Sequence, residues 1–151
     1  MTAPYRLSIP LCALATIVTS CSTPTDASRS VSLRVETDKT AYRLATDSSA
    51  EPFLINQGTL PVYAPMNEYV AVQRFQDGQW GQAKPWFSVD GAGISFPIEP
   101  GDTLRALPMD FAYVGDAPGR YRFIFAIAYD SLGHRLVAED QRVSPPFELE
   151  P

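Results

Sequence analysis

Apolar and polar residues alternate along much of the chain, and the alternation is strongest near its C-terminal end. Between Tyr121 and Tyr129, every odd position carries an aromatic or a branched apolar side chain. Successive side chains of a β-strand point to opposite faces, so these odd positions share one face. A buried aromatic side chain removes about 150–250 Å² from water. We therefore predict that this strand is the centre of the hydrophobic core.

Shorter segments of the same kind precede it at the spacing of an all-β protein. The predicted strands are Val31–Val35, Pro52–Asn56, Tyr69–Phe75, Trp86–Val89, Ile94–Ile98 and Thr103–Leu107. Turn signals separate them, because Asp77-Gly78 and Asp90-Gly91 are hairpin dipeptides and Glu99–Asp102 contains Pro-Gly. No window after residue 21 holds a sustained helical stripe of apolar residues, so we expect little helix.

A polar turn after the Tyr121–Tyr129 strand predicts an antiparallel return along Arg135–Val143. Pro145 and Pro146 follow it, and proline ends strand pairing because it has no N–H to donate. Taken together, the pattern predicts an antiparallel β-sandwich of about seven to nine strands over residues 31–150.

The first 20 residues have the layout of a secretory signal peptide. Arg6 supplies a positive charge, and the apolar run Leu7–Val18 is shorter than the roughly 20 residues that a membrane-spanning helix needs. Val18-Thr19-Ser20-Cys21 resembles the lipobox of bacterial lipoproteins. The resemblance implies cleavage before Cys21 and acylation of this residue, which anchors the protein to a membrane of the cell envelope. By the same analogy, Ser22 implies the outer membrane.

Residues 21–30 hold almost no apolar side chain and are predicted to be a flexible tether. The expected organisation is therefore a signal peptide at 1–20, a lipidated cysteine and tether at 21–30, and one folded domain at 31–150. The two cysteines of the chain, Cys12 and Cys21, both precede this domain. A core disulfide is thus excluded.

Pro118–Phe123 resembles the tyrosine corner of immunoglobulin-like and fibronectin type III-like sandwiches, with Tyr121 as the corner residue. Phe123 stands where antibody domains carry a cysteine. The order of motifs over residues 31–150 resembles small bacterial immunoglobulin-like domains of secreted proteins and lipoproteins. It also resembles the bacterial intracellular proteinase inhibitor family, from which the chain departs by its secretion signal. Neither resemblance implies a catalytic residue.

The composition narrows the possible chemistry. The 151 residues include 12 Lys and Arg and 17 Asp and Glu, a net charge of −5, which argues against a nucleic-acid partner. His134 is the single histidine and falls in a predicted solvated turn. Asp77-Gly78 and Asp90-Gly91 are more typical of hairpin turns than of Ca²⁺ ligands. Glu139-Asp140 is predicted to lie on a strand, with its two carboxylates on opposite faces. We predict no catalytic residue, no metal site and no cofactor.

Aromatic side chains remain as binding candidates. Tyr63, Trp80, Trp86 and Phe87 form a possible surface for a sugar or a partner protein if they are exposed. The competing interpretation, which we favour, places Trp80 in the core and Trp86 over a sheet edge. The proline-containing segment Leu60–Asn67 either protrudes as an inhibitory loop or connects the two sheets rigidly, and we favour the connection.

The sequence thus predicts a non-catalytic, membrane-anchored lipoprotein with an immunoglobulin-like binding or structural domain. The expected partners are the membrane, through acyl chains on Cys21, and an envelope protein or a glycan, with nucleic acid excluded. A protease inhibitor and a carbohydrate-binding module are the alternatives.

Overall fold

Strands make up almost all the regular structure of the computed structural model, which describes residues 30–66, 69–86 and 94–151. Within these ranges there is no α-helix, so the predicted all-β class is confirmed. The two short 3₁₀ helices are η1 (Phe111–Val114) and η2 (Glu139–Gln141). In the described part of the chain, no helix has the length and apolarity to span a membrane. The predicted signal peptide, Cys21, Phe87 and the Asp90-Gly91 turn lie outside the described residues.

The larger sheet runs in the order β2-β13-β12-β6-β7, and the short strand β8 also pairs with β6. Its strands are β2 (Ala41–Arg43), β13 (Phe147–Glu150), β12 (Gly119–Phe125), β6 (Val70–Gln76), β7 (Gln79–Trp80) and β8 (Lys84–Pro85). The β13–β2 pair is parallel, whereas the prediction was antiparallel throughout. No hairpin joins these two strands, so the local sequence does not set their relative direction.

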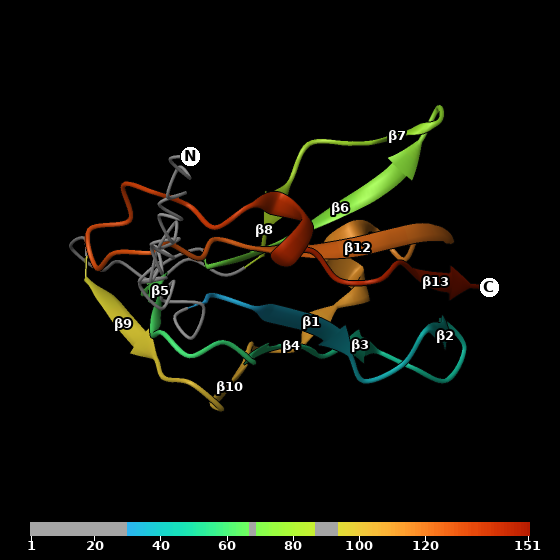
Figure 1. Cartoon of the computed structure of the whole chain (residues 1–151). Helices are drawn as coiled ribbons and strands as arrows, with labels where there is room; N and C mark the ends of the chain where they lie inside the picture. Colours follow the sequence, from blue (N-terminus) through green and yellow to red (C-terminus); the bar gives the residue numbers. More distant parts are fainter. Residues whose placement is uncertain (1–29, 67–68, 87–93) are drawn as a thin grey trace, which may run out of the picture.

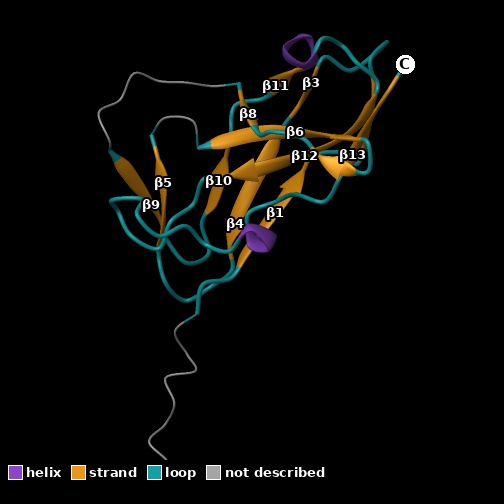
Figure 2. Cartoon of the chain, turned by 90° about the horizontal axis from the view of Figure 1, so that it is seen from above, coloured by secondary structure: helices purple, strands orange, loops and turns teal. Residues whose placement is uncertain are grey.

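The second sheet is antiparallel and runs in the order β1-β4-β10. Its strands are β1 (Leu33–Thr37), β4 (Pro52–Asn56) and β10 (Thr103–Arg105). Two further pairs are β3 (Ser49–Ala50) with β11 (Met109–Asp110), and β5 (Val62–Pro65) with β9 (Ser95–Ile98). Figure 1 shows the layer of β6, β12 and β13 lying over the layer of β1 and β4, with β5 and β9 at one end. Figure 2 shows the same arrangement from above.

The core lies between the two layers, and β12 supplies its largest side chains. Tyr121, Phe123 and Phe125 are at most 1% exposed, as predicted from the alternation. The ring of Phe147 stacks on the ring of Phe123 at 4.9 Å between centroids. The facing layer contributes smaller apolar residues, namely Leu33, Val35 and Leu54. The period-2 pattern therefore identified the buried face of this strand correctly.

The segment Arg135–Val143 returns antiparallel to the chain before it, as predicted, but it is not a continuous strand. The structure has only isolated antiparallel bridges there, and η2 includes Glu139, which was expected on a strand. Arg142 explains the difference, because its buried guanidinium donates to the carbonyls of Phe125 and Val137, each at 2.6 Å. These side-chain bonds satisfy acceptors that a strand ladder would otherwise have to pair. Burial lowers the pKa of Arg142.

Two predicted turns are confirmed. Asp77 and Gly78 join β6 to β7 with positive φ angles of 52° and 80°, the geometry of a type I′ hairpin. Gly101 has a φ of 87°, and the N–H of Asp102 donates to the carbonyl of Glu99 at 3.0 Å. Glycine is favoured at this third position of the turn because a Cβ would be strained there.

Tyr42 links the strand β2 to the turn before it. It is 1% exposed and packs edge-on against the rings of Phe111 and Phe147. Its hydroxyl donates to Asp38 Oδ1 at 2.5 Å and accepts from the N–H of Lys39. Burial, followed by the hydrogen bond to Asp38, raises the pKa of Tyr42 well above its usual value.

We expect this raised pKa to make the domain sensitive to alkali. Below pH about 10 the hydroxyl is protonated in the folded and the unfolded chain, so its stabilising effect is fully present. Above that pH only the unfolded chain ionises, and stability falls as the pH rises toward the folded pKa. The melting temperature of Tyr42→Phe should therefore decline less steeply than that of the wild type between pH 10 and 12. Equal slopes would contradict this account.

Candidate functional site

The structure separates the aromatic residues that were predicted to form one surface. Tyr63 lies on β5, at the end of the molecule opposite β7, which carries Trp80 (Figure 1). Trp86 directly follows β8, and Phe87 lies outside the described residues. The strand β5 also occupies the middle of Leu60–Asn67, the segment interpreted either as an inhibitory loop or as a rigid connection. Val62 and Ala64 are fully buried there, and their burial favours a paired strand over a protruding loop.

Trp80 and Trp86 lie on opposite faces of the larger sheet. Trp86 packs against the core, with its ring 5.1 Å from the ring of Phe123, and its buried indole N–H has no hydrogen-bond partner among the described residues. Trp80 pairs with Phe75, whose side chain points outward because Val70 and Val72 on the same strand point inward. Trp80 is therefore on the outer face rather than in the core, contrary to the interpretation favoured from the sequence.

Around Trp80 the outer face forms a cluster of aromatic and guanidinium groups, which we call the Trp80 surface. It consists of Gln73, Phe75, Trp80, Arg120 and Arg122. The rings of Phe75 and Trp80 are 5.1 Å apart. The guanidinium of Arg122 lies 4.5 Å from the centroid of the Trp80 ring, and that of Arg120 lies 5.7 Å from the Phe75 ring. Cation–π contacts of this kind hold flat side chains in place.

Strand β12 positions the arginines because its odd residues point into the core and its even residues point out. Arg122 Nε donates to Gln73 Oε1 at 2.8 Å, and its Nη2 lies 2.9 Å from Glu139. Arg120 pairs with Glu148 of β13 at 3.7 Å. The carboxylates neutralise the arginines in part, so the Trp80 surface presents rings and guanidinium planes with little net charge.

The polar residues considered for catalysis are dispersed. His134 is exposed, and its backbone N–H donates to Asp130 Oδ1 at 3.2 Å. The N–H of Leu132 donates to the same oxygen at 3.0 Å, and the N–H of Arg135 donates to Asp130 Oδ2 at 3.1 Å. Asp130 therefore organises the turn. Among the residues that the structure describes, no three His, Cys, Asp or Glu side chains gather as a metal site would require.

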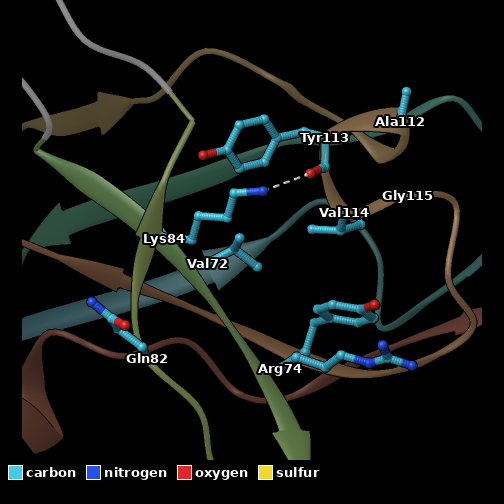
Figure 3. Close-up of a pocket in the computed structure, with 9 residues that line it drawn as sticks. Val72, Arg74, Gln82, Lys84, Ala112, Tyr113, Val114 and Gly115 are labelled. Atoms are coloured by element: carbon cyan, nitrogen blue, oxygen red, sulfur yellow. Dashed lines mark hydrogen bonds between the residues drawn. The ribbon is translucent and has the colours of Figure 1, made fainter.

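A pocket that sequence reasoning missed lies between β6, β8 and η1 (Figure 3), with a volume of about 460 Å³. It is lined by Val72, Arg74, Gln82, Lys84, Ala112, Tyr113, Val114, Gly115 and Tyr121. Arg74 follows Val70 and Val72 on the inward face of β6, so an arginine in an otherwise apolar inward series was the available signal. Nothing local indicated that η1 would close the other side.

Comparison with known proteins identifies no family. No protein-family model matches the chain, and no curated protein does. Among solved structures, the chain is similar to Pseudomonas fluorescens alkylpurine DNA glycosylase AlkC, which is bound to DNA containing an abasic site analog. The identity is 16% and the TM-score 0.40, over 82% of this chain. The chain spans 31% of the length of that structure's chain.

This comparison corrects the predicted exclusion of nucleic acid, because the similar structure is a complex with DNA. The exclusion rested on the net charge of −5. Net charge is a sum over the whole chain, and it does not forbid a local group of cations such as Arg74 and Lys84. The exclusion is withdrawn, and the likeness itself assigns no site and no activity to this chain.

Proposed function

We propose that the protein is a non-catalytic lipoprotein of the cell envelope, whose immunoglobulin-like β-sandwich domain binds a protein through the Trp80 surface. The lipobox-like Val18–Cys21 segment supports the anchor. Support for the fold comes from the two facing sheets and from Tyr121, whose hydroxyl donates to the carbonyl of Ala117 at 2.8 Å. A bond from this tyrosine to the backbone just upstream is typical of the tyrosine corner.

The Trp80 surface is the observation that carries the binding role. Tryptophan and arginine are the residues that most often dominate the binding energy of protein interfaces. Here both are present on an outer sheet face, and the contacts of Arg122 with Trp80, Gln73 and Glu139 hold them in one arrangement. A partner that binds such a preorganised surface immobilises fewer side chains, which lowers the entropy cost of association.

Photo-crosslinking in intact membranes tests this proposal. A photoreactive amino acid replaces Gln79, which is exposed beside Trp80. We expect one adduct of defined mass. Trp80→Ala should lower the yield of this adduct by about 30-fold, the effect of losing roughly 2 kcal/mol of binding free energy at an interface hot spot. Phe53→Ala is the matched control, because Phe53 also packs under an arginine, Arg105, but on the second sheet.

The control variant should leave the adduct unchanged. An adduct that survives Trp80→Ala, or that both variants weaken equally, would refute the role of the Trp80 surface. In the same strains, Cys21→Ser should move the protein from the membrane to the soluble fraction. If that variant stays in the membrane fraction, the proposed lipid anchor is wrong. The crosslinking result still decides the role of the Trp80 surface separately.

A further inference from the structure

The pocket between β6, β8 and η1 is basic, although the chain as a whole is acidic. Its lining includes Arg74 and Lys84 and no carboxylate. Figure 3 shows Lys84 beside Tyr113 on one wall and Arg74 on another, with Val72 and Val114 between them in this view. In a chain with 17 acidic and 12 basic residues, two cations in one pocket whose described lining holds no carboxylate call for a functional explanation.

Most of the other cations are already paired. Of the 12 Lys and Arg residues, Arg6 and Arg29 lie outside the described part. Six of the other ten form ion pairs, namely Arg34, Lys39, Arg43, Arg105, Arg120 and Arg122. Neither Arg74 nor Lys84 has an ion-pair partner among the described residues. Within the described residues, this pocket thus holds two positive charges that no carboxylate pairs with.

Both cations are held in position by neutral groups. Arg74 Nη2 donates to the carbonyl of Pro118 at 2.8 Å, and its guanidinium lies 5.6 Å from the ring of Tyr121. Lys84 Nζ donates to the carbonyl of Tyr113 at 3.1 Å and lies 4.1 Å from that ring. These bonds use one N–H of each cation, so further donors remain for a ligand.

The hydroxyl of Tyr113 donates to the carbonyl of Pro85, which ties η1 to the strand that carries Lys84. The pocket walls are therefore preorganised. Val72 and Val114 also line the pocket and offer apolar contact, and the volume of about 460 Å³ falls within the range of small-molecule sites.

From this arrangement we propose that the pocket binds a small organic anion, whose carboxylate or phosphate contacts Arg74 and Lys84 while its apolar part packs against Val72 and Val114. The proposal is independent of the Trp80 surface. Arg74 and Val72 point to the inner face of β6, whereas Phe75, which pairs with Trp80, points to the outer face. Failure of the proposal for the pocket therefore does not bear on the proposal for the Trp80 surface, and the reverse also holds.

Titration of the isotope-labelled, full-length protein in detergent tests the proposal by NMR. The probes are benzoate, phenyl phosphate, inorganic phosphate and, as a neutral analogue of benzoate, benzamide. We expect benzoate or phenyl phosphate to shift the amides of Gln82, Val114 and Gly115, which line the pocket. Benzamide should bind at least tenfold more weakly, because it lacks the charge that strengthens these hydrogen bonds.

The relative affinities of the probes identify the anionic group. Tighter binding of phenyl phosphate than of benzoate assigns a phosphate ligand, and the reverse assigns a carboxylate. Inorganic phosphate should bind more weakly than phenyl phosphate, since it has no apolar part. If inorganic phosphate and phenyl phosphate bind equally, or benzamide binds as well as benzoate, the proposed ligand class is wrong.

Charge substitutions complete the test. Arg74→Gln and Lys84→Gln should each weaken binding of the preferred probe by about tenfold, the usual scale for a charge-assisted hydrogen bond. The charge-conserving variants Arg74→Lys and Lys84→Arg should retain more of the affinity for this probe than the glutamine variants do. Arg135→Gln is the matched control, because Arg135 also stacks on a tyrosine, Tyr129, outside this pocket. Unchanged affinity in both glutamine variants, with amide spectra that show a folded protein, would overturn the proposal.

Discussion

Replacing Phe123 by alanine is expected to lower the free energy of unfolding by about 3–5 kcal/mol, the usual cost of truncating a buried aromatic residue. Phe123 is fully buried in the middle of β12. Its ring contacts Phe147 of the neighbouring strand β13 at 4.9 Å and Trp86, which follows β8, at 5.1 Å, so truncation removes both ring contacts at once. The cavity would lie between two packed layers that cannot close over it without moving whole strands.

Urea unfolding, followed by circular dichroism, measures this effect. Ile124→Ala is the control, because Ile124 is the next residue of β12 and is only partly buried on the outer face. It should cost less than half as much as Phe123→Ala. Similar losses at the two positions would mean that β12 does not separate a core face from a solvent face. That result would contradict the central position of the strand in the fold.

The second large effect is expected at Asn56, the last residue of β4. Asn56 is fully buried, and its side-chain amide donates to the carbonyls of Leu60 and Ile98, both at 2.9 Å. Its side-chain oxygen accepts from the N–H of Gly58 at 3.0 Å. One side chain therefore connects β4, the following turn and β9.

Asn56→Leu should cost about 3 kcal/mol or more, because it leaves two carbonyls and one N–H without partners, and each unpaired buried group costs roughly 1–3 kcal/mol. Gln57→Leu, at the exposed neighbouring position, is the control and should change stability by less than about 0.5 kcal/mol. Hydrogen exchange of the amides of β5 and β9 gives a local measure. If exchange there does not accelerate in Asn56→Leu, Asn56 is not the link between β4 and this strand pair.

Much of the strand content was predictable because it follows from local rules. Pro52–Asn56 is a strand with the predicted bounds, and the Asp77-Gly78 turn has the backbone that its two residues favour. The predictions that were wrong depended on contacts between residues far apart in the sequence. The segment after Phe125 does not form the predicted strand, because the guanidinium of Arg142 bonds to carbonyls that a ladder would have paired. Nothing in the alternation of residues indicates such a side-chain partner.

The candidate sites were less predictable than the strands. The sequence indicated aromatic residues as binding candidates, and Trp80 lies on an outer face beside Arg122. Its orientation depends on pairing with Phe75, and therefore on which face of β6 meets the other sheet. The pocket with Arg74 and Lys84 was missed, because η1 is more than 20 residues from either strand along the chain.

The sequence by itself determined the all-β class, the alternation that buries Tyr121, Phe123 and Phe125, and the acidic net charge of the chain. These properties follow from backbone geometry and composition, which each residue contributes locally. The tertiary structure decided which tryptophan lies on the outer face of the sheet, which cations line the pocket and how β13 runs relative to β2. Those outcomes depend on which distant strands become neighbours, and burial and charge pairing are properties of neighbours in space.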